Sequence, residues 1–393
     1  MSREIAERWY RALADGDRET LGKVLHPDLE VHVTPGMPLG LGGVHRGARA
    51  ALRDFWGVIA RHYRARAVPA TFDALSDGRL LVTGRYTGKA LGSGKPLDAE
   101  FTHLLTFTDG RIIRIDQLTD SRRWLDALAE DGPLDTIDYT GDNGVATLTL
   151  NRPTVRNAIN LQLAEEFLIA ARRCAADDSI RALLIKGNGP AFTVGGDISY
   201  FNDWHGPYGD LFRRMTGPFH EAFRILSRID APIITAVHGS IAGGGLGFAY
   251  IADFVLAAEG TKFATGFAAI GLSGDGGGTW FLPRLVGPRR AAQMYLRNRV
   301  LNAQEAVDWG IATEVVPPEE LDTRAISLAR ELAAGPTAAF GRMRALLRDS
   351  WGNSLSEQLL AETEALAETG DSADAAKAIE SFAAKRSPDF DGR

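Results

Sequence analysis

The segment Gly187-Asn-Gly-Pro-Ala-Phe-Thr-Val-Gly-Gly-Asp197 directly follows the apolar run Ala182–Lys186, which is typical of a buried strand. A second glycine-rich segment, His238-Gly-Ser-Ile-Ala-Gly-Gly-Gly-Leu-Gly247, follows the apolar run Pro232–Val237 in the same way. Glycine lets a backbone approach a ligand closely, and the first turn of a helix has N–H groups without partners inside the helix. Two such loops side by side are expected to hold one oxygen between two amides, as in an oxyanion hole.

Two other interpretations apply to these loops. Tight packing between a strand and the following helix also requires glycine, and it explains either loop when that loop is considered alone. Nucleotide binding is disfavoured, because neither segment has the pattern G-x-G-x-x-G and the chain lacks G-x-x-x-x-G-K-[ST].

The pattern around these loops indicates an α/β domain at residues 135–393. Strands and helices alternate through this part, and the tail Thr337–Lys385 is almost wholly helical. Residues 1–130 differ, because two or three amphipathic helices precede four or five alternating strands of an expected antiparallel sheet. The polar stretch Ala129–Pro133 is expected to be the linker between an α+β domain and an α/β domain.

Composition excludes several classes of function. The 393 residues include 44 basic and 50 acidic ones, a net charge of −6 that gives no basic face for nucleic acid. The single cysteine, Cys174, excludes a disulfide framework, and no His/Glu spacing predicts a metal site. Ala231–Ala252 is uncharged but contains a proline and several glycines, which favours a strand, loop and helix over a membrane span. With no signal peptide recognised, a cytoplasmic location without a membrane partner is expected.

Six motifs occur along the second domain: Asn151-Arg-Pro153, Asn157-Ala-Ile-Asn160, Ala191–Asp197, Gly243-Gly-Gly245, Gly276-Gly-Gly-Thr279 and Leu282-Pro-Arg284. Their order and spacing resemble the enoyl-CoA hydratase/isomerase (crotonase) family over about residues 135–390. The resemblance implies a crotonase fold of stacked ββα units. It also implies a thioester substrate carried by CoA or a carrier protein, no cofactor beyond that CoA, and assembly into trimers or hexamers.

The resemblance also implies roles for particular residues. The backbone amides of Gly196 and Gly244 would form the oxyanion hole and hold the enolate of the thioester. Further substrate contacts are implied at Phe192, Gly195, Asp197, Gly243, Phe267 and Trp280.

The two glutamates with which hydratases of the family add water are not present. Gly247 and Phe267 occupy their positions, so hydration by two glutamates is not expected. Asp275, in Gly271-Leu-Ser-Gly-Asp-Gly-Gly-Gly-Thr-Trp280, instead resembles the aspartate of isomerases in the family. A single carboxylate suits an allylic shift, because one base can take a proton from carbon 2 and return it to carbon 4.

Other roles for Asp275 and for the domain stay open. Asp275 could cap the following helix, or act as a nucleophile like the aspartate of the family's dehalogenases. The domain could also be a cyclase or carbon–carbon bond-forming enzyme of polyketide-type metabolism. The alternative from another class is a non-catalytic protein, which binds acyl-CoA or assembles with a partner.

Motifs in the first domain include Trp9–Asp17, Leu25–Glu30 and Phe107–Ile112. They resemble the SnoaL-like (polyketide-cyclase) branch of the nuclear-transport-factor-2-like superfamily over about residues 3–127, which implies a cone of sheet and helices around an apolar pocket. Candidate acid/base residues lie on or near the last strands: His103, Asp116 and Asp120. Strand alternation places His103 and Phe101 on the same face of their strand. It likewise places Asp116, Arg114 and Leu118 on a common face of the next strand. The alternative is that these are surface polar residues of a domain used for binding or dimerisation.

Overall fold

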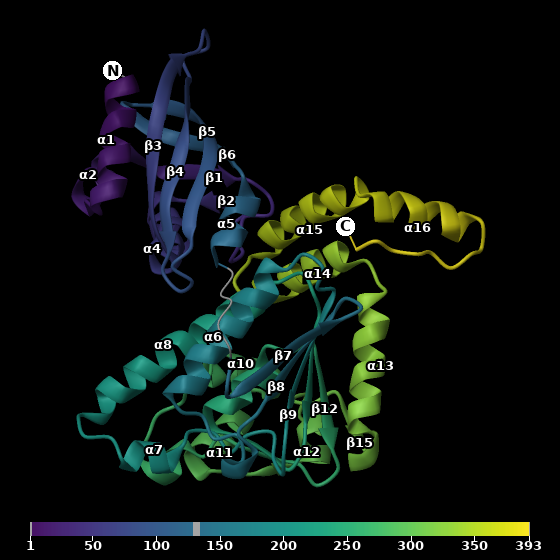
Figure 1. The fold of residues 1–393 in the computed structure, drawn as a ribbon. Helices are drawn as coiled ribbons and strands as arrows, with labels where there is room; N and C mark the ends of the chain where they lie inside the picture. The colour runs from purple at the N-terminus through teal and green to yellow at the C-terminus, as the bar shows by residue number, and fades with distance from the viewer. Residues whose placement is uncertain (1, 129–133, 393) are drawn as a thin grey trace. The chain divides into compact units, whose positions relative to one another are not determined.

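The structure, a computed structural model, describes residues 2–128 and 134–392 of the chain. Two compact units make up the chain, Met1–Gly132 and Pro133–Arg393, and Figure 1 colours them from purple to yellow along the sequence. The linker expected at Ala129–Pro133 lies outside the described residues. Within the described ranges, no helix combines the length and the apolar composition needed to cross a membrane.

The N-terminal unit is built on a six-stranded sheet with the order β2-β1-β6-β5-β4-β3. Its strands are β1 (Leu25–Val33), β2 (Gly43–Arg46), β3 (Tyr63–Ala74), β4 (Leu80–Ala90), β5 (Pro96–Thr108) and β6 (Arg111–Thr119). The predicted α+β class is confirmed, and the strands expected between residues 70 and 118 pair antiparallel as predicted. The sequence analysis did not predict β1 or β2. β1 runs parallel to β6, because the chain enters the sheet beside its last strand.

Helices pack against this sheet (Figure 1). They are α1 (Ser2–Asp15), α2 (Arg18–Val24), a continuous helical stretch of α3 (Ala48–Ala50), η1 (Ala51–Trp56) and α4 (Gly57–His62), and α5 (Ser121–Leu128). Asp17 caps α2 by accepting a hydrogen bond from Thr20 N, which ends the turn between the first two helices. α1 buries Trp9 and Tyr10, and β5 buries every second residue between Leu97 and Leu105, His103 included.

The C-terminal unit has two sheets. The larger one has the order β15-β12-β10-β9-β8-β7, and all its neighbouring strands run parallel except β7 and β8. Its strands are β7 (Ile137–Asp142), β8 (Val145–Leu150), β9 (Ala182–Gly187), β10 (Ile233–Val237), β12 (Phe254–Ala258) and β15 (Glu314–Val316). The smaller sheet consists of β11 (Ser240–Ala242), β13 (Lys262–Ala264) and β14 (Leu301–Asn302).

Helices enclose the larger sheet on both faces (Figure 1). α13 (Leu321–Ala333) packs on one face over an aliphatic core that includes Leu184, Ile234 and Leu256. α6 (Leu161–Ala176) and α8 (Tyr208–Leu226) pack together on the other side, where Phe167, Phe219, Phe223 and Phe248 form an aromatic cluster. The remaining shorter helices are α7 (Ile198–Asn202), α9 (Gly247–Tyr250), α10 (Gly278–Val286), α11 (Pro288–Arg297) and α12 (Ala303–Asp308). The aromatic cluster fixes α8, and therefore the side chains that α8 presents to the site.

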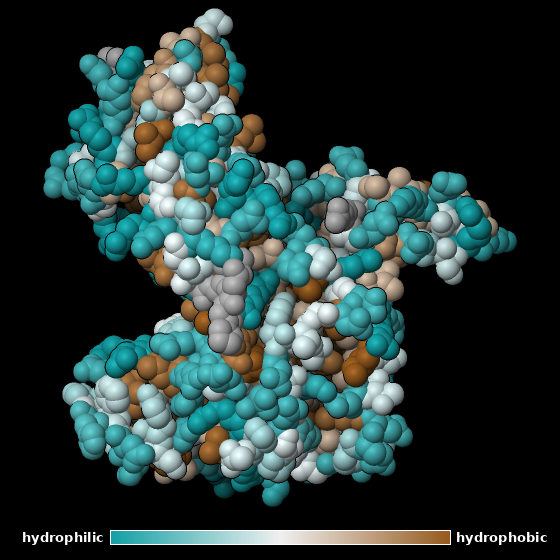
Figure 2. Space-filling model, in the orientation of Figure 1, coloured by the Kyte–Doolittle hydropathy of each residue, from teal (hydrophilic) through white to brown (hydrophobic). Residues whose placement is uncertain are grey.

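The tail that the sequence predicted to be almost wholly helical consists of three helices: α14 (Thr337–Asp349), α15 (Leu355–Gly370) and α16 (Ala373–Ala383). Several of their apolar side chains are open to solvent, with exposed fractions of 75% for Leu355, 75% for Leu366 and 85% for Phe382. Figure 2 shows apolar residues interspersed with hydrophilic ones on the visible face of this helical extension. The described structure therefore has the predicted class, an α+β unit followed by an α/β unit with a helical extension.

Candidate active site

The two glycine-rich loops meet at a backbone-to-backbone contact. A Cβ added to Gly195 would lie 3.0 Å from the carbonyl oxygen of Ala242, and one added to Gly243 would lie 3.5 Å from Cα of Gly195. Both glycines also have a positive φ, +85° and +56°, which residues with a Cβ rarely adopt. The positive φ therefore favours glycine at both positions, and at Gly195 the close approach of Ala242 favours it as well.

Two amides, those of Gly196 and Gly244, lie at this junction. Ile159 N donates to Gly195 O (2.8 Å) and Asp197 N donates to Ile159 O (2.9 Å). Because successive N–H groups alternate along an extended backbone, the N–H of Gly196 faces away from Ile159. Gly244 lies in the first turn of the 3₁₀ segment Gly243–Leu246, where N–H groups have no partner within the helix. Both residues line one cavity of about 500 Å³.

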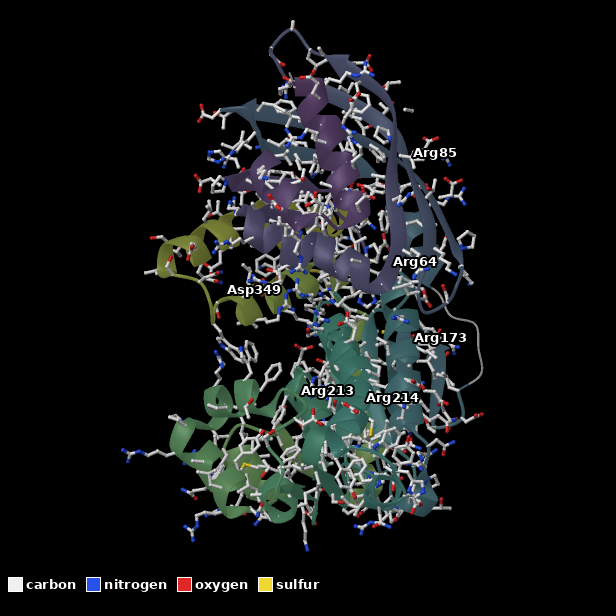
Figure 3. The ribbon with its side chains drawn as sticks, turned by 90° about the vertical axis from the view of Figure 1, so that its left-hand side faces the viewer. Arg64, Arg85, Arg173, Arg213, Arg214 and Asp349 are labelled. Atoms are coloured by element: carbon white, nitrogen blue, oxygen red, sulfur yellow. The ribbon has the colours of Figure 1, made fainter. Side chains whose placement is uncertain are left out.

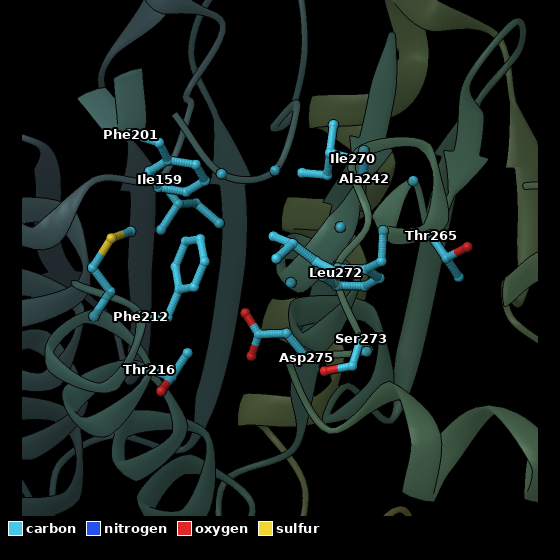
Figure 4. Close-up of a pocket in the computed structure, with 18 of the residues that line it drawn as sticks. Ile159, Phe201, Phe212, Thr216, Ala242, Thr265, Ile270, Leu272, Ser273 and Asp275 are labelled. Atoms are coloured by element: carbon cyan, nitrogen blue, oxygen red, sulfur yellow. The ribbon is translucent and has the colours of Figure 1, made fainter. Parts of the chain in front are cut away.

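The walls of this cavity are mostly apolar. Ile159, Phe201, Phe212 and Leu272 line it, and Figure 4 shows the Asp275 carboxylate pointing into the space that faces Phe212. Side chains from α8 follow a helical repeat along one wall: Phe212, Met215, Thr216, Phe219 and His220. A cavity of this size and polarity suits an acyl chain with a few polar groups at one end.

The two carboxylate oxygens of Asp275 have different surroundings: one accepts hydrogen bonds, and the other lies beside the glycine loop. Its Oδ1 accepts hydrogen bonds from Nε2 of His220 and from the backbone N–H of Gly276. A Cβ added to Gly244 would lie 2.7 Å from Asp275 Oδ2, so this oxygen sits directly over Gly244. The helix-cap interpretation of Asp275 is wrong, because α10 begins after Gly277 and has no side-chain cap.

His220 is a site residue that the sequence analysis missed. It lies on α8, and its side chain is 47% exposed while contacting a carboxylate 55 residues away. Its position on the cavity face of α8, next to the buried Phe219, was the available signal. The spacing of residues in the sequence does not predict that this face of α8 lies against the loop of Asp275.

The hydratase positions have no carboxylate and, at Gly247, no room for one. A Cβ added to Gly247 would lie 2.4 Å from Cε2 of Phe223. Phe267 lines the cavity, and its ring stacks on that of Tyr295 with centroids 6.1 Å apart. Burial, and to a smaller extent the nearby Asp275 carboxylate, raises the pKa of Tyr295 to about 12, so this phenol stays protonated at neutral pH.

The other predicted substrate contacts lie in different places. Gly195, Gly243 and Phe267 line the cavity. Phe192 is fully buried against Phe248. The Asp197 side chain accepts hydrogen bonds from Tyr200 N (3.1 Å) and from Arg152 Nη1 (3.0 Å), so it fastens the loop to the start of α7.

Trp280 lies outside the residues that line the cavity, and 40% of it is exposed. Its ring contacts Trp351 at 4.7 Å between centroids, and the Arg284 guanidinium lies 4.5 Å from its ring centroid. Among the described residues, no group of three or more His, Cys, Asp or Glu side chains is arranged to hold a metal ion.

The N-terminal unit has a separate cavity of about 470 Å³ in which His103 is buried. β5 and β6 pair so that Gln117, rather than Asp116, lies opposite His103. Asp116 instead pairs with Arg114 at 2.7 Å, beside the exposed Leu118, which confirms the predicted sharing of one face. Asp120 is exposed and accepts from Arg123 N at the start of α5. The structure therefore does not bring the three candidate residues together.

Comparison with known proteins assigns both units. The family model described as enoyl-CoA hydratase/isomerase matches residues 140–393, and the model described as SnoaL-like domain matches residues 6–115. The chain therefore belongs to the enoyl-CoA hydratase/isomerase family and carries an N-terminal SnoaL-like domain.

Individual relatives differ in their named activities. The chain is 38% identical over 253 residues to 1,2-epoxyphenylacetyl-CoA isomerase of Escherichia coli (strain K12), covering 64% of this chain and 97% of the relative. It is 33% identical over 223 residues to 4-chlorobenzoyl coenzyme A dehalogenase-2 of an Arthrobacter species, covering 56% and 79%. It is 31% identical over 256 residues to trans-2-decenoyl-[acyl-carrier-protein] isomerase of Streptococcus mutans, covering 65% and 97%.

Solved structures agree with the fold. A putative enoyl-CoA hydratase/isomerase from Mycobacterium abscessus superposes with a TM-score of 0.62 at 35% identity, covering 65% of this chain and 100% of that chain. A putative enoyl-CoA hydratase from Streptomyces coelicolor gives 0.63 at 31% identity, with coverages of 67% and 97%. The C-terminal unit thus has the crotonase fold.

Proposed function

We propose that the C-terminal unit is a cofactor-independent enoyl-thioester isomerase that moves a double bond through an enolate. The amides of Gly196 and Gly244 hold the thioester oxygen, and Asp275 carries the proton. The acyl group occupies the apolar cavity, and its thioester carrier, CoA or a carrier protein, remains attached throughout the reaction. CoA enters only as part of the substrate.

The reaction needs one base and one oxyanion site. Asp275 removes a proton from carbon 2 of a 3-enoyl thioester, and the electron pair moves onto the thioester oxygen. The resulting dienolate is stabilised by the two amide donors, which act best where charge develops. The carboxylic acid then returns the proton to carbon 4, which gives the 2-enoyl thioester.

The observation that carries this proposal is the position of Asp275 Oδ2 directly over Gly244. A proton acceptor at this position would lie beside one of the two proposed oxyanion donors, inside a cavity with room for an acyl chain. The hydratase alternative lacks such support, since Gly247 has no room for a side chain and Phe267 cannot carry a proton. Relatives named as isomerases of acyl-CoA and acyl-carrier-protein thioesters support the same reaction class.

Proton exchange in heavy water tests the proposal. Wild-type protein is expected to introduce deuterium at carbon 2 or carbon 4 of 3-enoyl and 2-enoyl thioesters. Asp275→Asn keeps the side-chain shape and is expected to lose about 10³-fold in rate, within the range for general acid–base catalysis. Asp203→Asn, an exposed substitution after α7, serves as the matched control and is expected to exchange at the wild-type rate.

Absence of exchange in the wild type would overturn isomerisation of these substrates. Tight thioester binding without exchange would then favour the non-catalytic alternative. New carbon–carbon bonds in the products would favour the cyclase alternative.

The contact between His220 and Asp275 favours a second candidate, nucleophilic catalysis. An Asp275 oxygen would bond to the ring carbon of a halogenated aromatic acyl-CoA, and halide would leave with the bonding pair. Once the ester has formed, His220 in the tautomer with its proton on Nδ1 could take a proton at Nε2 from the water that hydrolyses the ester. One turnover of 4-chlorobenzoyl-CoA in ¹⁸O-labelled water would place the label in the Asp275 carboxylate, which mass spectrometry of that peptide detects. An unlabelled peptide after turnover excludes this candidate.

We further propose that the chain works as a homo-oligomer, a trimer or hexamer, assembled through the helical extension. The exposed apolar side chains of α14 and α15 support this, among them Leu347, Leu355 and Leu366. Single exposed apolar residues are ordinary on a surface, but a row of them along the last helices is typical of an interface.

A further inference from the structure

The glycine loop at residues 192–197 uses most of its backbone N–H groups within the protein. In the described structure its donors are bonded as follows: Phe192 N to His238 O (2.9 Å), Thr193 N to Ser240 O (3.0 Å), Val194 N to Arg156 O (3.2 Å), Gly195 N to Thr193 Oγ1 (3.2 Å) and Asp197 N to Ile159 O (2.9 Å). Gly196 N has no acceptor among the described residues. Of the described loop, the Gly196 amide is therefore the one available to a ligand at the cavity.

The Thr193 side chain connects this loop to the second glycine loop. Thr193 is fully buried, and its Oγ1 accepts from Gly195 N while it donates to Asn157 O (2.7 Å). Its methyl group lies against the other loop, since a Cβ added to Gly245 would be 2.3 Å from Cγ2 of Thr193. One side chain therefore contacts both loops, each time at the neighbour of a proposed oxyanion donor.

These contacts matter because glycine does not fix the direction of its own peptide planes. Gly195 has a φ of +85°, and a glycine can leave this conformation for many others without steric cost. The hydroxyl bond to Gly195 N limits rotation of the backbone directly before the Gly196 amide. The methyl contact at Gly245 and the bond from Thr193 N to Ser240 O anchor the same residue to the second loop. The direction of the amide is thereby set relative to the other oxyanion donor.

Among the described residues that line the cavity, no lysine or arginine accompanies these amides. Arg213 and Arg214 lie on α8, but both are exposed (Figure 3), and Arg213 pairs with Asp210 at 2.9 Å. The charge on a thioester enolate would therefore be held by the two amides, and its stabilisation depends on how they are aimed.

We propose that Thr193 is a positioning residue that sets the direction of the Gly196 amide relative to the Gly244 loop. Its hydroxyl directs the amide, and its backbone and methyl contacts anchor it to the second loop. Thr193 lies outside the residues that line the cavity, so it acts through the loops and does not touch the substrate. The inference rests on the enolate mechanism proposed above and adds to it the residue that aligns the oxyanion donors.

Infrared spectroscopy of a bound thioester measures this alignment without requiring turnover. The probe is hexanoyl-CoA with ¹³C at the carbonyl, because a C=O bond that accepts strong hydrogen bonds vibrates at lower frequency. Isotope-edited difference spectra, recorded with the probe saturating each protein, isolate this band. Wild-type protein is expected to lower the carbonyl frequency relative to the free thioester in water. The rate of deuterium exchange at carbon 2 of a 3-enoyl thioester is measured on the same proteins.

Variants isolate the hydroxyl of Thr193. Thr193→Val keeps the shape without the hydroxyl, and it is expected to lose about half of the frequency shift and to exchange about 10- to 100-fold more slowly, because one of two donors is misdirected. Thr193→Ser keeps the hydroxyl and should retain most of the shift. Thr193→Ala differs from Thr193→Ser only in that hydroxyl and should not, so this pair provides the test if Thr193→Val fails to fold.

Thr261→Val is the matched control. Thr261 is also fully buried, and its hydroxyl donates to Ala258 O (2.7 Å) in the turn after β12. This variant should also lower the melting temperature, because a buried hydrogen bond is lost. Its carbonyl shift and exchange rate should remain at the wild-type values.

Equal shifts in wild type, Thr193→Val and Thr193→Ala would overturn the inference, since the hydroxyl would then have no part in aligning the amide. A shift lost equally in Thr193→Ser and Thr193→Ala would also overturn it, because packing alone would explain the effect. A wild-type protein that exchanges protons without any carbonyl shift would overturn the inference while the isomerase proposal stands. A wild-type shift without proton exchange would contradict the isomerase proposal, while the variants would still decide the role of Thr193.

Discussion

Nε2 of His220 on α8 hydrogen-bonds to Oδ1 of Asp275 in the loop that precedes α10. The same oxygen accepts from Gly276 N, while Oδ2 lies over Gly244. The carboxylate therefore has one oxygen that is held by hydrogen bonds and one that lies beside the glycine loop of the cavity. In the proposed isomerisation, Oδ2 carries the proton and His220 is a positioning residue.

Replacing His220 should therefore lower kcat and leave KM nearly unchanged. His220→Phe removes the donor to Oδ1 and is expected to slow isomerisation by about 10- to 100-fold, because a misplaced base loses much of its general-base rate contribution. His220→Gln retains a side-chain N–H and should restore most of the lost rate. His205→Gln, an exposed substitution after α7, is the matched control.

Steady-state kinetics with an enoyl thioester distinguish positioning from simple packing. If Phe and Gln at position 220 reduce kcat equally, the hydrogen bond has no positioning role. A rise in KM with constant kcat would assign His220 to substrate binding instead.

Gly247→Glu should not create a hydratase. The new side chain would begin 2.4 Å from the Phe223 ring, and overpacking in a filled core typically costs about 1–3 kcal/mol before the buried charge is counted. We expect a lower melting temperature and no hydration of crotonyl-CoA. Gly217→Glu, on α8 where an added Cβ meets nothing within 4 Å, is the matched control and should melt near wild type. Hydration by a Gly247→Glu protein of unchanged stability would contradict this account.

The sequence predicted the elements that local pattern controls. Apolar runs located β8, β9 and β10. The glycine loops that follow β9 and β10 do meet, because parallel strands bring their carboxyl ends to one edge. The pairing of His220 with Asp275 could not be predicted in this way. It depends on how the aromatic cluster under α8 sets the rotation of that helix, and this is a property of packing between distant segments.

The N-terminal unit gives a second example. Alternation assigned Asp116, Arg114 and Leu118 to one face correctly, but it could not say which face points inward. The register of β6 against β5 decides this, since it sets Gln117 opposite His103. The parallel pairing of β1 with β6 could likewise not be predicted from local pattern, because it joins segments from opposite ends of the unit.

Stability of the N-terminal unit should fall as the pH falls below the ordinary histidine range. The folded pKa of His103 is about 3 while an unfolded histidine titrates near 6.5, so between these values only the unfolded chain binds this proton. The free energy of unfolding should then drop by about 1.4 kcal/mol per pH unit from this residue. His103→Gln keeps one donor and one acceptor for the hydroxyls of Tyr10 and Tyr86, which lie 2.7 Å and 2.9 Å from the ring nitrogens of His103, and should remove that part of the pH dependence.

Hydrogen exchange of peptides from β4 and β5 at about pH 4.5 and pH 7 measures this effect within the unit. Carboxylates titrate in the same range, so the comparison between wild type and His103→Gln isolates the histidine. Identical slopes for the two proteins would show that His103 is protonated as readily in the folded chain as in the unfolded one.

Charge placed on the helical extension should disrupt assembly. Leu355 and Leu366 are each 75% exposed on α15, a helix without a single buried residue, and a second copy would remove such side chains from water. Leu355→Glu together with Leu366→Glu would place two carboxylates in that interface, and each unpaired buried charge costs several kcal/mol. Sedimentation velocity should show a trimer or hexamer for wild type and a monomer for this variant. Val155→Glu adds charge at an exposed position of the same unit and should leave the oligomer intact. An unchanged oligomer in the double variant would show that the interface lies on another surface. A monomeric wild-type protein would contradict the proposed assembly.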